Sequence, residues 1–175
     1  MRRLLLLRHA KSDWSVPGQT DYDRLLSPRG EDAAPLMGAY MAREGLVPER
    51  AIVSSAARTR ETWRLLSQAF ANPPPATFDD RIYEAEPEEI LAAIAEVPAN
   101  VNKLLVVGHN PGFQDTASLL TGSGDKPSRA LMAAKFPTAA LAVIDFDCAD
   151  WSALAPHTGR LDRFVTPRAL ASQPD

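Results

Sequence analysis

Leu4-Leu5-Leu6-Leu7-Arg8-His9 is the stretch of sequence that decides the fold of this chain. Its four leucines are continuous rather than alternating with polar residues, which is typical of a strand covered on both faces in a parallel sheet. The run is too short for a secretory signal, whose apolar region needs roughly 7–15 residues, because Arg8 interrupts it. The sequence therefore predicts a buried strand over residues 4–7, with a guanidinium and an imidazole directly at its carboxyl end.

A second stretch of the same kind occurs later in the chain. Lys103-Leu104-Leu105-Val106-Val107 is predicted to form a strand and is followed by Gly108 and His109. Short apolar runs alternate with longer segments of helical period, which indicates an α/β fold with a mostly parallel sheet. Further strands are predicted over residues 51–53, 77–78 at a sheet edge, 139–146 and 161–165, and helices from Ser27-Pro28 to just before Gly45 and over about 56–70, 87–97 and 113–120.

Two segments are expected to lack regular structure. Residues 121–128 are rich in Gly, Ser and Pro and are predicted to form a mobile loop. The tail after about residue 167 is expected to fray. Because no repeat and no linker separates two apolar cores, we expect residues 1–175 to form a single domain.

Composition excludes several classes of protein and partner. Of the 175 residues, 45% are hydrophobic and 23% are charged, which is ordinary for a soluble globular domain. The net charge of -3 provides no overall basic field for nucleic acid or an anionic membrane surface. The one cysteine, Cys148, cannot form an intramolecular disulfide and offers too few thiolates for a structural zinc cluster. We therefore expect a cytoplasmic protein with no nucleic-acid or membrane partner.

The histidines mark the candidate site. Two of the three histidines, His9 and His109, directly follow predicted strands. In doubly wound α/β proteins the ligand crevice lies beyond the carboxyl ends of the strands, so both imidazoles are expected there. The alternative for either one alone is a strand-end histidine bonded only to backbone.

Two arginines indicate what this site would bind. Arg8 adjoins His9, and Arg58 lies at the predicted start of the helix that follows the second strand. A helix start offers free backbone N–H groups, and guanidinium groups match phosphate oxygens in a bidentate manner. Two arginines and two histidines brought together from separate strand ends would make a pocket for a phosphoryl group. The alternative for Arg58 alone is a solvated helix face.

Three motifs in this order resemble a known family. Arg8-His9-Ala10-Lys11-Ser12, Ser54-Ser55-Ala56-Ala57-Arg58-Thr59-Arg60-Glu61-Thr62 and Val106-Val107-Gly108-His109-Asn110-Pro111 together resemble the histidine phosphatase superfamily. Three segments are most similar to its SixA-type phosphohistidine phosphatase branch: the first motif extended to Trp14, the loop Asp21-Tyr22-Asp23-Arg24-Leu25-Leu26-Ser27 and Gly108-His109-Asn110-Pro111. The resemblance covers about residues 2–165. It implies a three-layer α/β/α sandwich of the phosphoglycerate mutase type.

The resemblance also implies a role for each residue of the pocket. His9 would be the nucleophile that forms a phosphohistidine enzyme, and Arg8 and Arg58 would neutralise charge on the phosphoryl oxygens. His109 would donate a hydrogen bond to the phosphoryl group. Positioning and electrostatics would do most of the catalysis, so neither a metal nor a cofactor is expected.

Three further residues are candidate members of the site. Glu84 follows Ile82-Tyr83 in the region where relatives that act on alkyl phosphates place a general acid. The alternative is that Glu84, like the acidic residues after it, supports the start of a helix. Ser15 and Arg24 are candidate phosphate contacts: Ser15 stands where many members carry a phosphate-binding Asn, so that contact is lost, shortened through Ser15 or supplied by Arg24 instead.

Chain length bears on the substrate. A chain of 175 residues leaves little material for a lid over a small substrate, so an open site for a phosphorylated protein is expected. Phosphohistidine on a signalling protein, such as a histidine phosphotransfer domain, is the leading hypothesis. A small phosphorylated metabolite is the alternative substrate, and a phosphate-binding module without turnover is the alternative from another class.

Overall fold

The computed structural model describes residues 1–172, and its centre is a seven-stranded sheet with the order β3-β2-β4-β1-β6-β7-β5. Only β6 runs against its neighbours, so the predicted α/β fold with a mostly parallel sheet is confirmed. The strands are β1 (Arg2–Arg8), β2 (Arg50–Ser54), β3 (Ala76–Asp79), β4 (Lys103–Gly108), β5 (Thr121–Gly124), β6 (Leu141–Phe146) and β7 (Gly159–Val165). The α-helices are α1 (Pro28–Arg43), α2 (Ala57–Ser67), α3 (Pro87–Ala95), α4 (Gly112–Leu120), α5 (Lys126–Ala134) and α6 (Pro167–Ala171), and two 3₁₀ turns cover Asp80–Ile82 (η1) and Trp151–Ala153 (η2).

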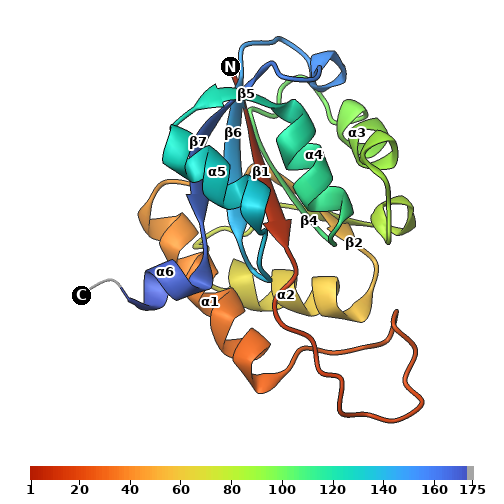
Figure 1. Ribbon diagram of the computed structural model, residues 1–175. Helices are drawn as coiled ribbons and strands as arrows, with labels where there is room; N and C mark the ends of the chain where they lie inside the picture. Colours follow the sequence, from red (N-terminus) through yellow and green to blue (C-terminus); the bar gives the residue numbers. More distant parts are fainter. Residues whose placement is uncertain (173–175) are drawn as a thin grey trace.

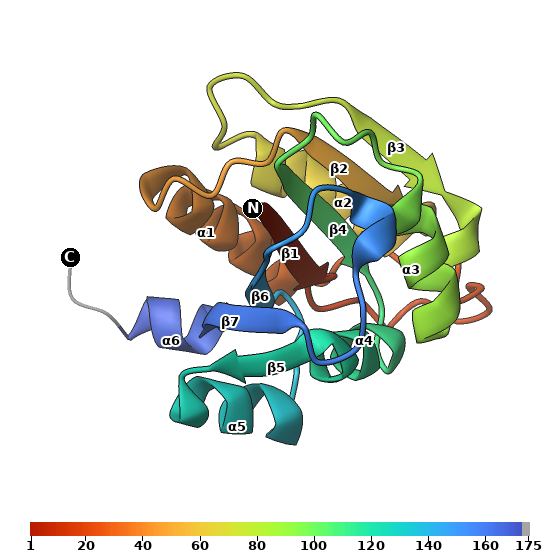
Figure 2. The ribbon, with the colours of Figure 1, turned by 90° about the horizontal axis from the view of Figure 1, so that it is seen from above.

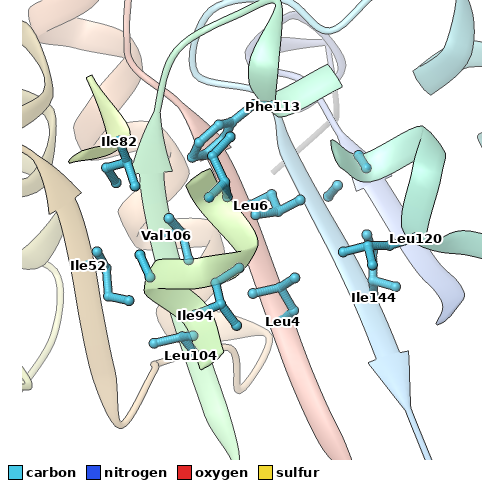
Figure 3. Close-up of a cluster of buried hydrophobic side chains, with 14 of the residues drawn as sticks. Leu4, Leu6, Ile52, Ile82, Ile94, Leu104, Val106, Phe113, Leu120 and Ile144 are labelled. Carbon is cyan, nitrogen blue, oxygen red and sulfur yellow. The ribbon is translucent and has the colours of Figure 1, made fainter. Parts of the chain in front are cut away.

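The leucines of β1 point alternately to the two faces of the sheet, and helices cover both faces. Leu4 and Leu6 pack in one apolar cluster with residues of α3 and α4, which Figure 3 shows in close-up. Leu5 and Leu7 pack in the other cluster with residues of α1 and α2. Figure 2, seen from above, shows α1 on one side of the strands and α3 and α4 on the other. A continuous apolar run is required here because every side chain of β1 between the two layers is removed from water.

The pairing of β1 with β4 determines where the two histidines lie along the strand direction. The two strands are parallel, with Arg3 opposite Lys103 and Arg8 opposite Gly108. Each strand is followed at once by a histidine, so His9 and His109 leave the sheet at the same edge and the same height.

Helix α1 begins and ends as its sequence predicts. The Ser27 hydroxyl accepts a hydrogen bond from the backbone N–H of Gly30 at 3.2 Å, and Pro28 occupies the first turn. After the helix, Gly45 has a φ of 69°, a left-handed conformation that glycine adopts without steric cost. The predicted strands over 4–7, 51–53, 77–78, 103–107, 139–146 and 161–165 are likewise confirmed, with ends shifted by a few residues.

The prediction of a mobile loop over residues 121–128 is wrong. Residues 121–124 form β5, which pairs with β7 at the sheet edge, and α5 begins at Lys126. A Cβ on Gly122 would lie 1.9 Å from the carbonyl oxygen of His157, so a glycine there reflects close packing rather than flexibility. The Asp125 carboxylate caps α5 by accepting from the backbone N–H of Ser128 at 3.0 Å. Tertiary pairing here overrides a composition that favours a loop.

The tail predicted to fray forms a helix instead. The Thr166 hydroxyl caps α6 by accepting from the backbone N–H of Ala169 at 3.2 Å. Leu170 is 8% exposed and joins the apolar cluster of α1 and α2. The prediction is therefore wrong for residues 167–171, and residues 173–175 lie outside the described residues. No helix within residues 1–172 is both long enough and apolar enough to span a bilayer.

Candidate active site

The main side chains singled out from the sequence gather at one edge of the sheet, beyond the carboxyl ends of β1, β2 and β4. Figure 1 shows the arrowhead of β1 pointing to this edge, where the loop over residues 9–27 projects from the body of the molecule. His9, Arg58 and His109 are all buried there. Their ring and guanidinium groups contact one another directly.

His9 carries its proton on the nitrogen that faces away from the other site residues. Its Nδ1 lies 2.7 Å from the carbonyl oxygen of Ala10, which can only accept, so Nδ1 is the protonated nitrogen of the neutral ring. The Nε2 lone pair is then free and accepts a long hydrogen bond from Arg58 Nε at 3.4 Å. The backbone N–H of Ala10 donates to Thr62 Oγ1 at 3.0 Å and fixes the turn that presents the ring. The free Nε2 has the geometry of a nucleophile.

Burial keeps the His9 ring neutral. Loss of solvent lowers its pKa to about 3, and the charges of Arg58 and Arg8 act in the same direction. The bond to Ala10 and the carboxylate of Asp21 oppose this shift without overcoming it. At neutral pH the imidazole is therefore unprotonated on Nε2.

His109 is held by two partners that fix its orientation. Its Nε2 donates to Ser54 Oγ at 2.7 Å, and its Nδ1 accepts from Arg58 Nη2 at 3.2 Å. Burial lowers the pKa of His109 to about 3, with further lowering from His9 and Arg58. The two imidazole centroids are 5.3 Å apart. In this neutral form Nδ1 is an acceptor, so a hydrogen bond from His109 Nδ1 to a phosphoryl oxygen would require a second proton on the ring or the other tautomer, in which the Ser54 hydroxyl donates to Nε2.

Arg58 connects the two histidines because of where α2 begins. It lies in the first turn of α2, whose start is fixed by Thr59 Oγ1 donating to the carbonyl oxygen of Ser54 at 2.6 Å. Its Nη1 and Nη2 also donate to the backbone oxygen and the carboxylate of Asp21 at 2.7 and 3.0 Å. All three nitrogens of this guanidinium thus have partners.

Arg8 differs from Arg58 in being incompletely paired. Its Nη1 donates to the carbonyl oxygen of Phe136 at 2.9 Å, whereas its buried Nε has no hydrogen-bond partner among the described residues. No carboxylate within residues 1–172 forms an ion pair with it. Burial and the charge of Arg58 lower its pKa. A half-buried cation with an unused, buried donor beside a second arginine is a favourable place for an anion.

Asp21 and Tyr83 belong to the site although sequence analysis did not propose them. The Tyr83 hydroxyl donates to Asp21 Oδ2 at 2.5 Å, on the same oxygen that accepts from Arg58. Burial opposes ionisation of Asp21, but the bonds from Tyr83 and Arg58 and the charges of Arg58 and Arg24 hold its pKa below the usual value. Burial and the Asp21 carboxylate raise the pKa of Tyr83 to about 12. The sequence placed Asp21 in a motif, but nothing in it brings this loop onto Arg58.

The structure brings Arg24 close to the site but not Ser15. Arg24 is buried, its Nη2 lies 3.8 Å from Asp21 Oδ1, and its guanidinium stacks 3.4 Å above the ring of Trp14. Ser15 is exposed, and its backbone N–H donates to Asp13 at 2.8 Å. None of the contacts of Ser15 within the described part of the chain reaches His9, Arg8, Arg58 or His109.

Glu84 lies beside the site in an unusual backbone conformation. Its φ is 50°, which is uncommon for a residue with a side chain and is often associated with functional loops. The side chain is exposed and has no hydrogen bond to another described residue. The preceding ring, Tyr83, packs edge-on against His109 with centroids 5.4 Å apart. The segment therefore reaches the site through Tyr83, with Glu84 at its outer rim.

A close backbone contact holds this segment in place. A Cβ on Gly112 at the start of α4 would lie 2.2 Å from the carbonyl oxygen of Ala85. Only a glycine allows the chain after Glu84 to approach α4 so closely. Within residues 1–172 no group of three or more His, Cys, Asp or Glu side chains is arranged to hold a metal ion.

Comparison with known proteins gives matches over most of the chain. The model of the histidine phosphatase superfamily (branch 1) matches residues 4–103. An uncharacterised protein of Mycobacterium leprae is 32% identical over 166 residues, which cover 93% of this chain and 100% of that protein. A structure from Agrobacterium tumefaciens described as a candidate phosphohistidine phosphatase SixA has a TM-score of 0.80 and 32% identity, covering 95% of this chain and 98% of that one. A structure from Nakamurella multipartitia described in the same way has a TM-score of 0.82 and 29% identity, covering 95% and 96%.

Proposed function

The chain belongs to branch 1 of the histidine phosphatase superfamily and is a phosphatase, and on that premise we propose that it hydrolyses phosphohistidine on a protein through a phospho-His9 intermediate. The observation that carries this proposal is the free Nε2 of a buried, neutral His9 beside Arg58. No metal takes part in the proposed reaction. The site residues each have one role in it.

In the first step, His9 Nε2 attacks phosphorus in line with the leaving nitrogen. A bond forms between Nε2 and phosphorus, the substrate N–P bond breaks, and its electron pair stays on the substrate imidazole, which takes a proton from solvent. Arg8 and Arg58 stabilise the charge on the phosphoryl oxygens, with Arg8 using the Nε that has no partner among residues 1–172. In the second step, water attacks phosphorus and the bond to His9 breaks, which releases inorganic phosphate.

His109 and Asp21 would respond to the arrival of the phosphoryl group. A dianion beside His109 raises the pKa of its imidazole, so the ring can carry protons on both nitrogens and donate from Nδ1 to a phosphoryl oxygen. The carboxylate of Asp21 already occupies Arg58 Nη2 and repels a second anion. Substrate binding would therefore require the Arg58–Asp21 contact to loosen. Arg24 is then a second cation that can pair with the Asp21 carboxylate or with the phosphoryl group.

Two observations favour a phosphorylated protein over a small phosphate ester. The structures that cover almost the whole of this chain at 29–32% identity are described as candidate phosphohistidine phosphatases. Glu84, the residue proposed as general acid, is exposed and has no hydrogen bond to another described residue. An imidazole leaving group needs less acid assistance than an alkoxide, so an exposed carboxyl group without a fixed position suits phosphohistidine.

The decisive experiment measures phosphate release from a histidine-phosphorylated phosphotransfer domain in the presence of a chelator. We compare the wild type with His9→Ala and with the matched control His157→Ala, which removes the exposed third histidine. The wild type and the control should release phosphate and form an acid-labile, base-stable phosphoenzyme, and His9→Ala should do neither. Release at the wild-type rate by His9→Ala would contradict the proposal, as would loss of all activity on chelation.

A second arm of the experiment separates the substrate classes. Glu84→Gln should keep phosphohistidine turnover within about threefold, whereas an enzyme for alkyl phosphates would lose about 10²–10⁴-fold. Faster turnover of a sugar phosphate than of the phosphorylated domain would identify a small-molecule phosphomonoesterase. Phosphate binding with no turnover of any substrate would identify a binding module.

A further inference from the structure

A groove next to the candidate active site has no role in the proposed reaction. It has a volume of about 440 Å³ and lies between α1, α5, α6 and the end of β7. Figure 2 shows α6 between α1 and α5, and Figure 1 shows the three helices on the same side of the molecule. Apolar side chains contribute to its lining, among them Leu131, which is 64% exposed, together with Pro137 and Phe164.

The groove shares two chain segments with the phosphoryl site. Lys11 lines the groove and is two residues after His9. Lys135 and Pro137 line it on either side of Phe136, whose carbonyl oxygen holds Arg8 Nη1 at 2.9 Å. An anion-binding pocket and this groove are therefore built from the same two stretches of backbone, and a ligand lying in the groove would be continuous with the site.

The side chains that line the groove carry positive charge, opposite in sign to the net charge of the chain. Four cations line it, Lys11, Arg29, Lys135 and Arg168, and no carboxylate of residues 1–172 does. All four are exposed, and none forms an ion pair with another residue within 1–172. The chain as a whole has a net charge of -3. A local concentration of cations around apolar side chains is complementary to a segment with carboxylates and an apolar face.

We propose that this groove docks an acidic, amphipathic segment of the phosphorylated protein substrate and so directs its phosphohistidine into the site. This inference rests on the proposed function and adds to it a rule for substrate choice. Carboxylates of the segment would lie against Lys135 and Arg168, and its apolar side chains against Leu131 and Phe164. The cations would raise the rate of encounter and the affinity, and the reaction at His9 would be unchanged.

The test uses peptides that carry chemically phosphorylated histidine. Each peptide of the first series carries one Glu-Leu-Glu-Glu cluster, and the number of residues between the cluster and the phosphohistidine differs from peptide to peptide, on either side. The matched series has Gln in place of each Glu. Free phosphohistidine is the third substrate. The double variant Lys135→Glu/Arg168→Glu reverses two groove charges, and Lys126→Glu is the control, because it reverses an exposed cation at the other end of α5.

For the best acidic peptide, the double variant should lose about tenfold in kcat/KM through KM, with kcat unchanged. Its turnover of free phosphohistidine should stay within twofold of wild type, and Lys126→Glu should match wild type on all substrates. The preference of the wild type for acidic peptides should shrink between about 0.05 and 0.5 M salt, since salt screens exposed charges. Fluorescence anisotropy of the unphosphorylated acidic peptide provides binding constants that do not depend on catalysis.

The outcomes separate the two proposals. Equal kcat/KM of the wild type for acidic and neutral peptides at every separation would overturn the docking groove and leave the phosphatase intact. No turnover of any phosphohistidine substrate would overturn the proposed function. Binding to phosphatidylserine vesicles that the double variant loses, without a preference among peptides, would also overturn the inference, in favour of a lipid surface.

Discussion

The guanidinium of Arg58 contacts His9 Nε2, His109 Nδ1 and the Asp21 carboxylate at once. A planar group with five donors in fixed directions can serve all three partners from one position. Its charge also helps to keep both imidazoles neutral. At the scale of single residues, one side chain therefore joins the parts of the site, while burial does most to keep both imidazoles neutral.

Arg58→Lys should lower kcat/KM on a phosphohistidine substrate by about 10²-fold or more, because an ammonium group cannot hold two phosphoryl oxygens and both histidines together. Steady-state kinetics measure this loss. Arg60→Lys is the matched control: Arg60 lies two residues later in α2, is exposed, and donates from Nε to the carbonyl oxygen of Ser55. It should stay within about threefold of wild type, and equal losses in the two variants would contradict the role of Arg58.

At the scale of elements, the site depends on contacts between segments that are far apart in sequence. The segment after η1 carries Tyr83 onto His109, and it can do so because Gly112 lets Ala85 approach the first turn of α4. Neither contact is local. Helices and strands fix the heights of His9, Arg58 and His109, whereas these loop contacts determine what surrounds them.

Gly112→Ala should destabilise the fold by about 1–3 kcal/mol, since the new Cβ would force backbone to move. It should also lower kcat/KM about tenfold, because the displaced segment takes Tyr83 away from His109. Denaturant unfolding and kinetics on free phosphohistidine measure the two effects.

Gly45→Ala is the control for this prediction. Gly45 has a φ of 69° but nothing within 4 Å of an added Cβ. This variant should lose about 1–2 kcal/mol from backbone strain and keep wild-type kinetics. Unchanged kinetics in Gly112→Ala at a comparable loss of stability would show that the contact does not position the site.

At the scale of the whole molecule, the buried histidines couple folding to pH. The pKa of both His9 and His109 is lowered to about 3 in the folded protein, against 6.5 for a free imidazole. Between these values the unfolded chain binds more protons than the folded one. Stability contributed by the two neutral rings is therefore fully present above pH 6.5 and is lost as the pH falls toward 3.

The free energy of unfolding should fall with decreasing pH between 6.5 and 5 by up to about 1.4 kcal/mol per pH unit for each buried histidine. Urea unfolding at several pH values measures the slope. The double variant His9→Asn/His109→Gln should have a flatter dependence, and His157→Asn controls for histidine substitution as such. The same slope in the wild type and the double variant would contradict this linkage.

The sequence by itself determined the central fold and the main members of the site. Continuous apolar runs require strands covered on both faces, and His9 and His109 had to leave the sheet together once those strands were paired in parallel. The cap at Ser27 and the glycine at position 45 fixed the ends of α1, because capping is a local interaction. The predictions from composition were wrong for β5 and α6. Pairing with β7 outweighs weak local preferences in β5, and burial of Leu170 does so in α6.

Only the tertiary structure decided which loop groups complete the site. Asp21 meets Arg58 across 37 positions of sequence and Tyr83 across 62, and no periodicity or motif spacing encodes such contacts. The same holds for the tautomers of the two histidines, which are set by the Ala10 carbonyl, Ser54 and Arg58. Local patterns determine secondary structure because they act between neighbours. Hydrogen bonds and burial at a site depend on the path of the whole chain, and they exist only once the sheet and its loops have formed.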